Sequence, residues 1–260
     1  MTTSTGLSGR VALVTGAGRN IGAVIATELA RRGAGVAVNY LKSAKGAHDV
    51  VRAIESAGGR AGAYQADVRD AEAVRDMLAA VDKDLGAVDT LVLNATGFED
   101  VLRGPALSHT VEELEEEIAA QFRAAMVPAY ALAPQMAERG GGNIVFISAV
   151  YPRRTMAGGL GHALAKVSVE TAMKHLAVEL GPHNVRVNTV IPDVTRSENF
   201  ERAIKLEHVA AQLDSYIGAI PMRRIAEPEE VARAVAAIVS DDMSYVTGAF
   251  LPVAGGNLIF

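Results

Sequence analysis

The stretch VALVTGAGRNIGAVIATELARRG, residues 11–33, decides the fold class. It opens with a short apolar run, continues through a glycine-rich turn and ends in a segment with the periodicity of an amphipathic helix. A strand, a glycine turn and a helix in this order suit a pyrophosphate, because the first N–H groups of the helix are unpaired and the turn lets the backbone approach the ligand. We expect Gly16 to permit the tight turn and Gly22 to allow close packing at the start of the helix.

The same alternation of short apolar runs and long amphipathic segments continues along the chain. Strands are predicted at residues 11–15, 35–40, 62–66, 90–95, 143–148, 185–191 and 249–253. Strands that are apolar on both faces and alternate with helices form a parallel sheet covered by helices on both sides, and right-handed crossovers make it doubly wound. The predicted fold is therefore a three-layer, Rossmann-like α/β fold in a single domain spanning residues 1–260, with a helical flap over the pocket at about 196–220.

The composition limits the partners. The chain has 260 residues, of which 50% are hydrophobic, and a formal net charge of −5. This balance argues against binding nucleic acid or anionic lipid, since both need an excess of clustered Lys and Arg. There are no cysteines, and the histidines show no metal-ligand spacing, so no metal is expected. Without a signal-like start or a long apolar window, we expect a cytoplasmic protein that does not enter membranes and acts on a small-molecule substrate.

The glycine turn and several later segments resemble the short-chain dehydrogenase/reductase family. The spacing T-G-x-x-x-x-x-G is similar to the family's T-G-x-x-x-G-x-G, with Asn20 at the place of a glycine. Asparagine enters the left-handed backbone region more readily than most residues, so the turn should persist. The other matching segments are Asp67-Val68, LVLNATG (91–97), RVNTVIPDV (186–194), in which Asp193 replaces a glycine, and residues 220–256.

The resemblance implies a nicotinamide cofactor, and the charges favour NADP(H). NAD recognition normally uses a carboxylate at the end of the second strand, where this chain has Asn39 and Tyr40. Arg19 and Lys42 could instead bind a 2′-phosphate. The residues predicted to bind the cofactor are Gly16, Arg19, Asn20, Ile21, Gly22, Asn39, Tyr40, Lys42, Ser43, Asp67, Val68, Asn94, Ala95, Lys166, Pro192, Val194 and Thr195.

The catalytic positions implied by the resemblance are mostly changed. The family pairs a tyrosine and a lysine as Y-x-x-x-K, so that the ammonium lowers the pKa of a phenol that protonates the substrate, and adds a serine and an asparagine. Aligned on Lys166, the other three positions hold His162, Ala149 and Gln121. Ala149 cannot donate a hydrogen bond, so the standard catalytic set is incomplete.

A second register restores a phenol. The branch resembling 2,4-dienoyl-CoA reductases places its tyrosine fifteen residues before the lysine, which is Tyr151 here. Tyr151 and the Gln121 amide could act as donors to an enolate, with His162 relaying protons near neutral pH. The predicted catalytic residues are Lys166, Tyr151, His162, Gln121 and Ser148. We therefore expect an NADP(H)-dependent oxidoreductase that reduces an activated C=C or C=O group of a small or acyl-type substrate with a non-standard proton donor.

Two alternatives remain at this stage. One is a redox-silent member, either a cofactor-binding scaffold or a lyase or cyclase that uses His162 as a base. The other is an ordinary ketoreductase in which His162 replaces the tyrosine. A homo-oligomer, dimer or tetramer, is also expected, because the predicted helices 113–137 and 161–180 carry more apolar surface than one sheet face needs.

Overall fold

The fold is built on one seven-stranded parallel sheet. The computed structural model describes residues 6–98, 102–205 and 207–259, and its strand order is β3-β2-β1-β4-β5-β6-β7. The strands are β1 (Val11–Val14), β2 (Gly35–Tyr40), β3 (Arg60–Gln65), β4 (Thr90–Leu93), β5 (Gly142–Ile147), β6 (Val185–Pro192) and β7 (Phe250–Val253). The chain builds outward from β1 to one edge and then from β4 to the other, so the predicted doubly wound fold class is confirmed.

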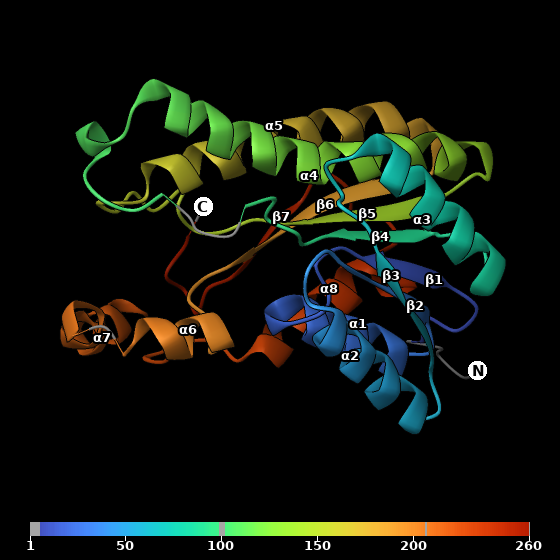
Figure 1. Cartoon of the computed structure of the whole chain (residues 1–260), viewed down its shortest axis with the longest axis horizontal. Coiled ribbons are helices and arrows are strands. Elements are labelled where there is room, and N and C mark those ends of the chain that lie inside the picture. The colour runs from blue at the N-terminus through green and yellow to red at the C-terminus, as the bar shows by residue number, and fades with distance from the viewer. Residues whose placement is uncertain (1–5, 99–101, 206, 260) are drawn as a thin grey trace.

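Helices cover both faces of the sheet (Figure 1). The α-helices are α1 (Asn20–Arg31), α2 (Ala44–Ser56), α3 (Ala71–Asp84), α4 (Val111–Glu138), α5 (Leu160–Leu180), α6 (Glu198–Ala203), α7 (Glu207–Ala219) and α8 (Pro228–Val239). One apolar core lies between the sheet and α3, α4 and α5, and a second lies between the sheet and α1, α2 and α8. The three predicted layers are therefore present.

Side-chain caps fix where the long helices begin. At the start of α4, the Thr110 hydroxyl accepts from the Glu113 backbone N–H at 3.2 Å, and the Glu113 carboxylate accepts from the Thr110 N–H at 2.8 Å. At the start of α3, the Asp70 carboxylate accepts from the backbone of Glu72 at 2.8 Å. These bonds satisfy N–H groups that have no partner within the helix. The loops before both helices are thereby held at the carboxyl edge of the sheet.

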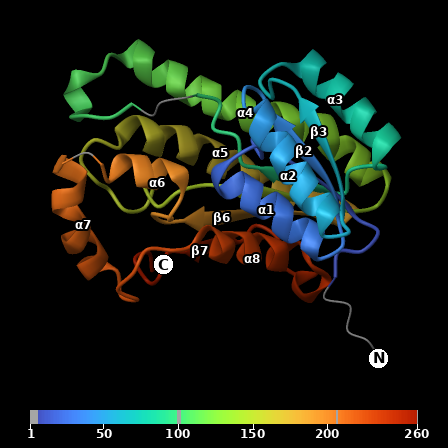
Figure 2. The ribbon, with the colours of Figure 1, turned by 60° about the horizontal axis from the view of Figure 1, so that its bottom comes forward.

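The topology collects the predicted site residues at one edge of the sheet. In a parallel sheet the carboxyl ends of all strands lie on the same side, and the order reverses here between β1 and β4. The glycine turn follows β1, and the loops after β3, β4, β5 and β6 open toward the same side. The predicted flap forms α6 and α7, which project beyond the end of β6 (Figures 1 and 2).

Apolar side chains remain exposed along α4 and α5. Tyr130 on α4 keeps 68% of its surface exposed, and Val178 on α5 keeps 77%. The expectation that a second copy covers these helices stays a prediction. No helix within the described ranges has the length and apolar character needed to cross a bilayer.

Candidate active site

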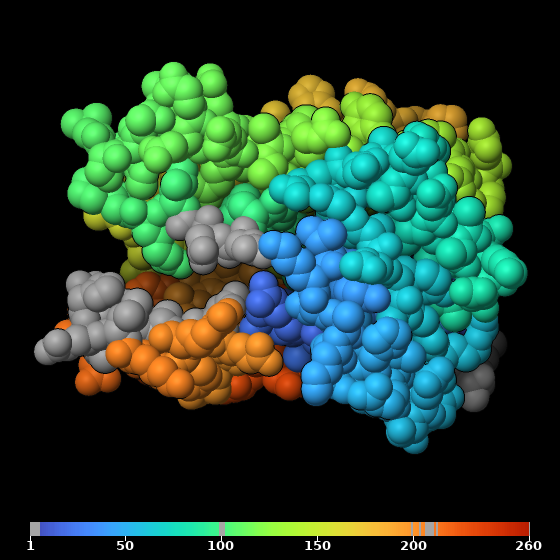
Figure 3. Space-filling view, viewed as in Figure 1, coloured from blue at the N-terminus to red at the C-terminus, as the bar shows by residue number. Residues whose placement is uncertain are grey.

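A long cleft of about 1140 Å³ runs over the carboxyl ends of the strands. Figure 3 shows a hollow between the residues that lead into α4, in green, and those of α6, in orange. The cleft extends from the glycine turn, past the ends of β4 and β5, to α6 and α7. We call the part from the glycine turn to Lys166 the nucleotide half and the part beyond Lys166 the reaction half.

The glycine turn has the conformation that its sequence predicts. Gly16 has φ = 62° and Asn20 has φ = 51°, so the left-handed conformation expected of Asn20 is confirmed. A Cβ atom at Gly22 would lie 2.5 Å from the Asn94 amide nitrogen and 2.6 Å from the Gly16 oxygen. Gly22 is therefore required for the start of α1 to pack against the turn and the end of β4.

Asn94 ties the turn to β4. Its amide nitrogen donates to the Thr15 carbonyl at 2.9 Å, while the Thr15 hydroxyl accepts from the backbone of Asn94 at 2.9 Å and of Ala95 at 3.0 Å. These bonds leave the backbone N–H groups at the start of α1 facing the cleft, together with Ile21 and Gly22, which line it.

Asn39 is positioned differently from the sequence-based expectation. Its side chain is buried beneath the turn, where Oδ1 accepts from the Gly16 N–H at 3.1 Å and Nδ2 donates to the Ala66 carbonyl at 3.1 Å. Because both ends of the amide are bonded to the backbone, Asn39 holds the turn against β3 and is not free to bind a ribose. Tyr40, Lys42 and Ser43 line the cleft beyond it, as does Arg19 on the turn.

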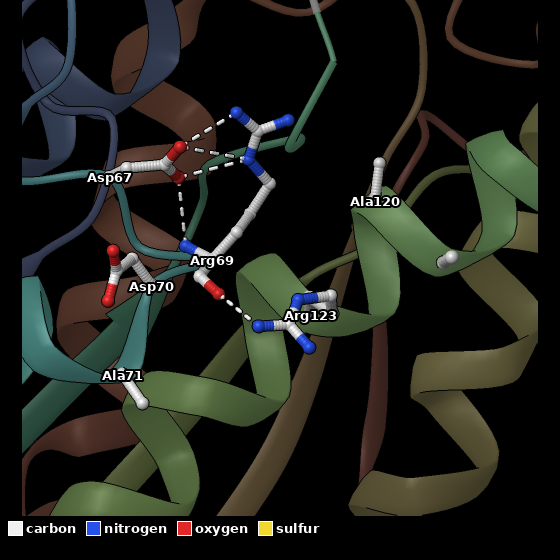
Figure 4. Close-up of a pocket in the computed structure, with 7 residues that line it drawn as sticks. Asp67, Arg69, Asp70, Ala71, Ala120 and Arg123 are labelled. Carbon is white, nitrogen blue, oxygen red and sulfur yellow. Dashed lines mark hydrogen bonds and ion pairs between the residues drawn. The ribbon is translucent and has the colours of Figure 1, made fainter.

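Asp67 is joined to a residue that the sequence reading missed. Both carboxylate oxygens accept from the Arg69 guanidinium, with the shortest N···O distance 2.7 Å (Figure 4). Arg69 also donates to the Gly97 carbonyl at 2.9 Å, and its own carbonyl accepts from Arg123 at 2.7 Å. The guanidinium holds the pKa of Asp67 below its ordinary value. The Asp67 oxygens also accept from the Arg69 backbone N–H at 2.9 Å, so their four hydrogen bonds come from within the protein. Val68 follows Asp67 in the lining of the cleft.

Lys166 lies in the floor of the cleft between its two halves. The ammonium donates to the Ile147 carbonyl at 2.9 Å and lies 4.9 Å from the centre of the Phe146 ring. Only 4% of the residue is exposed, and burial lowers its pKa to about 8, against the field of Glu170, which raises it. The amine is therefore mostly cationic at pH 7.

His162 is held neutral by the site. Burial, then the charges of Lys166 and Arg103, lower its pKa to about 3. Nδ1 is buried and has no partner among the described residues. The expectation that His162 titrates near neutral pH is wrong for this environment, because an imidazolium here would be both desolvated and repelled by a neighbouring cation. Its role as a proton relay stays a prediction.

Tyr151 lies against His162 in the reaction half. The two ring centres are 5.3 Å apart and the planes meet at 89°, an edge-to-face contact. Phe98 contacts the same imidazole from another side, with ring centres 6.4 Å apart. The absence of a side chain at Gly159 leaves room for the Tyr151 ring. Tyr151, His162 and Lys166 thus line one continuous surface of the cleft, with Ala149 beside them.

The side chains of two predicted catalytic residues, Ser148 and Gln121, form hydrogen bonds with other groups of the protein. The Ser148 hydroxyl donates to the Glu170 carboxylate, which also pairs with Arg153 at 2.7 Å, so this hydroxyl is not aimed at a substrate. Gln121 is fully buried on α4 outside the described lining of the cleft, and its amide donates to the Ala95 carbonyl at 3.3 Å. Spacing along the sequence could not give the direction of these two side chains.

The end of β6 contributes a network that spacing did not reveal. The Asp193 carboxylate accepts from the Tyr216 hydroxyl of α7, from Asn257 at 2.5 Å and from the Val194 N–H at 2.7 Å. Burial and this carboxylate raise the pKa of Tyr216 above its ordinary value, so the phenol remains the donor. The Thr195 hydroxyl donates to the Asp193 carbonyl at 2.9 Å, and Pro192 and Val194 line the cleft.

Comparisons with known proteins agree on the kind of protein that carries this cleft. Residues 16–257 match the family model described as Enoyl-(Acyl carrier protein) reductase. An uncharacterized oxidoreductase of Methylorubrum extorquens is 36% identical over 96% of this chain and 98% of its own, and the 1-cyclohexenylcarbonyl-CoA reductase of Streptomyces collinus is 33% identical over 95% and 86%. A 7α-hydroxysteroid dehydrogenase solved with NADH and 7-oxo glycochenodeoxycholic acid superposes with a TM-score of 0.88 at 27% identity, covering 97% of this chain and 96% of that one.

Proposed function

Because the chain belongs to the short-chain dehydrogenase/reductase superfamily, we propose that it is an NADP(H)-dependent reductase of an activated C=C or C=O group, with Tyr151 as the proton donor. The observation that carries the proposal is the edge-to-face contact of Tyr151 with His162, with ring centres 5.3 Å apart, in the cleft that Lys166 also lines. It explains how a site without the usual serine and tyrosine keeps one acid. The substrate is a small or acyl-type molecule.

The residues of the nucleotide half fit a dinucleotide. The start of α1 offers unpaired N–H groups and the positive end of a helix dipole to a pyrophosphate. Asp67 and Val68 line the adenine end of the proposed site, and we assign the Lys166 ammonium as a donor to the ribose hydroxyls. NADPH, when bound, supplies the hydride. The protein supplies binding and orientation.

The charges at the adenosine end support a 2′-phosphate. Arg19, Lys42 and the start of α2 at Ser43 line this end. Asp67 is the only acidic residue among the described residues that line this end, and its carboxylate is already paired with Arg69. A phosphate dianion would meet cations and helix N–H groups without facing an unpaired acid. NADP(H) is therefore preferred over NAD(H) in this proposal.

The field of Lys166 separates the two candidate acids. A nearby cation favours the deprotonated form of any group. A phenol is a neutral acid, so its proton-donating form carries no positive charge for the ammonium to repel. For the His162 imidazole, burial and then the same field disfavour the cationic form and lower the pKa to about 3. A histidine at the position implied for tyrosine thus cannot replace it as an acid, and Tyr151 takes that role.

The reaction balances with the hydride that bound NADPH would supply to the electrophilic carbon. The Tyr151 phenol would give one proton to the carbonyl oxygen or, for a conjugated C=C, to the α-carbon. The Tyr151 phenolate takes its proton back from solvent. A neutral His162 N–H can donate to the developing oxyanion. Relatives named for reducing a cyclohexenylcarbonyl thioester and solved with a 7-oxo bile acid support both substrate types.

The redox-silent alternative receives less support. A lyase or cyclase would need His162 to accept and hold a proton during turnover. The burial and the Lys166 charge that lower its pKa oppose this, because they destabilise the imidazolium. An ordinary ketoreductase with His162 as the acid meets the same obstacle.

The decisive experiment compares Tyr151→Phe with wild type in NADPH oxidation across ketones, cyclic enones and enoyl thioesters. We expect kcat to fall by about 100-fold or more, the range in which a general acid contributes, while the Kd for NADPH stays within twofold. Tyr245→Phe is the matched control, because Tyr245 is fully exposed outside the described cleft. Equal turnover by Tyr151→Phe on every accepted substrate would contradict the assignment. Tight NADPH binding with no consumption by wild type would favour the redox-silent reading.

A further inference from the structure

The reaction half of the cleft is walled mainly by apolar side chains. Those described are Phe98, Val150, Met156, Ala157, Val194, Phe200 and Leu213. They come from the ends of β4, β5 and β6 and from α6 and α7, so apolar surface lies on several sides of the space beyond Lys166. Such a wall selects the body of a ligand by hydrophobic contact, and the few charged groups set its orientation.

The acid in this half is used by the protein itself. Asp193 is the only acidic residue among the described residues that line the cleft beyond Lys166. It accepts from Tyr216, from Asn257 at 2.5 Å and from the Val194 N–H at 2.7 Å, and only 8% of the residue is exposed. Three internal donors satisfy most of its acceptor capacity. Asp193 therefore holds α7 in place and offers little to a cationic substrate.

The bases in this half are not neutralised in the same way. Arg103 lines the cleft, and no hydrogen bond or ion pair joins it to another residue in the described part of the chain. Its charge lowers the pKa of His162, so its field acts on the reaction half. The Arg154 guanidinium stacks 5.1 Å from the centre of the Tyr216 ring, and its Nη1 atom is buried without a partner among the described residues. Arg103 and Lys166 thus line this half as cations, with Arg154 behind Tyr216 of the lining, against the one described lining carboxylate of Asp193, although the chain as a whole carries −5.

The segment that presents Arg103 is held in place. The Leu102 N–H donates to the Glu117 carboxylate at 3.3 Å, and Gly104 lies against the backbone at Gly158. Burial on α4 raises the pKa of Glu117, the charge of Arg103 lowers it, and one Glu117 oxygen already accepts from Leu102. Arg103 is thus fixed beside the cleft and is not paired with Glu117.

We propose that the reaction half binds an apolar substrate that carries an anionic group, and that Arg103 binds this group. The inference rests on the proposed function for the reaction itself, and adds the class of substrate. A guanidinium recognises carboxylate and phosphate oxygens equally well in geometry. The anion is either a carboxylate on the substrate or the phosphates of a coenzyme A thioester, and the two sources are separated by experiment.

The first test measures kcat/KM with NADPH for a cyclic enone or ketone bearing a carboxylate, for its methyl ester and for its coenzyme A thioester. Wild type should prefer the free acid or the thioester over the ester by about tenfold, which corresponds to roughly 1.4 kcal/mol. Arg103→Gln should bring the ratio to about one, mainly through KM. Arg52→Gln, on α2 outside the described cleft, should keep the wild-type ratio. Preference for the free acid identifies a carboxylate, and preference for the thioester alone identifies the phosphates.

A second readout does not depend on turnover. Calorimetric titration of the NADPH complex with cyclohexanecarboxylate and with coenzyme A should show binding of at least one of them, weakened about tenfold in Arg103→Gln. If wild type reduces no substrate but this anion binding still depends on Arg103, the proposed function fails and the inference stands. If wild type reduces acid, ester and thioester equally well, or if Arg103→Gln leaves both ratio and binding unchanged, the inference is overturned and the reductase assignment survives.

Discussion

The two halves of the cleft differ in how their polar atoms are used. In the nucleotide half, Thr15, Asn39 and Asn94 each bond to backbone groups on a neighbouring strand. In the reaction half and just behind it, His162 Nδ1, Gln121 Oε1 and Arg154 Nη1 are buried with no partner among the described residues. Buried polar atoms are normally satisfied. In the nucleotide half the strand-end side chains are bonded within the protein and Asn20 Oδ1 is buried without a partner among the described residues, whereas the reaction half and its surroundings leave three such atoms for ligands to satisfy.

The largest effect on this difference is expected from Gly22→Ala, which disturbs the glycine turn of the nucleotide half. The new Cβ would lie 2.5 Å from the Asn94 amide and 2.6 Å from the Gly16 oxygen, so the turn must shift. We expect a loss of about 1–3 kcal/mol in the free energy of unfolding, as for other overpacked sites, and at least a tenfold weaker Kd for NADPH. Urea unfolding and fluorescence titration measure the two effects. Gly181→Ala is the matched control, because its added Cβ would contact nothing within 4 Å. Equal behaviour of the two variants would show that the turn is more adaptable than its packing indicates.

The second prediction concerns how the free energy of unfolding depends on pH, and it tests the neutral state of His162 in the reaction half. His162 has a folded pKa of about 3, below the ordinary 6.5, so the unfolded chain binds the extra proton between these values. Stability contributed by the neutral folded ring is present above pH 6.5 and is lost as the pH falls toward 3. Between pH 7 and pH 5 the loss at this one group is about 2 kcal/mol.

His162→Phe should remove that loss and keep the edge-to-face contact with Tyr151. Urea unfolding at pH 7 and pH 5 of both proteins gives the difference directly, and His183→Phe, on the exposed turn before β6, serves as control. An identical pH dependence in wild type and His162→Phe would mean that the imidazole is not held neutral by the fold, and the argument that excludes it as the acid would fail with it.

The sequence predicted the backbone structure of the nucleotide half better than the side-chain arrangement of the reaction half, for a physical reason. Strand ends and the glycine turn depend on local backbone preferences, which short segments encode. The predicted strand 90–95 ends early, at Leu93, because the backbone N–H groups of Asn94 and Ala95 turn to the Thr15 hydroxyl. That correction is small and lies within one loop.

Side-chain direction and pKa depend on contacts between distant segments, which spacing along the chain does not carry. Tyr216 meets Asp193 across 23 positions, and Asn257 meets it across 64. Ser148 turns to Glu170 on α5, and the neutral state of His162 follows from its depth of burial beside Lys166. A buried carboxylate where a related sequence has glycine was the one available signal for Asp193. Nothing in the spacing marked Arg69 or Arg103.

Loosening the flap with Tyr216→Phe should have an intermediate effect. The phenol is one of three donors to Asp193, and the other two remain in the variant. Loss of one such bond costs about 1 kcal/mol and leaves a buried carboxylate less well satisfied. We expect KM for the substrate to rise several-fold with little change in the Kd for NADPH, because α7 borders the reaction half. Steady-state kinetics and cofactor titration separate the two. If only the Kd for NADPH rose, the hydrogen bonds of Tyr216 and Asn257 to Asp193 would act on the nucleotide half, contrary to this prediction.

The smallest effect is expected from Asn20→Gly, which tests whether the nucleotide half tolerates the residue that the family resemblance implies. Asn20 already has φ = 51°, a conformation that glycine adopts without strain, so the turn geometry should be retained. Glycine relieves the cost of a left-handed asparagine but is more flexible in the unfolded chain, and the two effects, each below about 1 kcal/mol, oppose each other. The free energy of unfolding and the NADPH Kd should therefore change little, within about threefold for the Kd. Asn20→Val separates conformation from side-chain chemistry, since a β-branched residue resists positive φ and should weaken cofactor binding. If Asn20→Gly instead abolishes NADPH binding, the Asn20 amide itself contacts the cofactor. The nucleotide half would then, like the reaction half, use a buried polar side chain to bind its ligand.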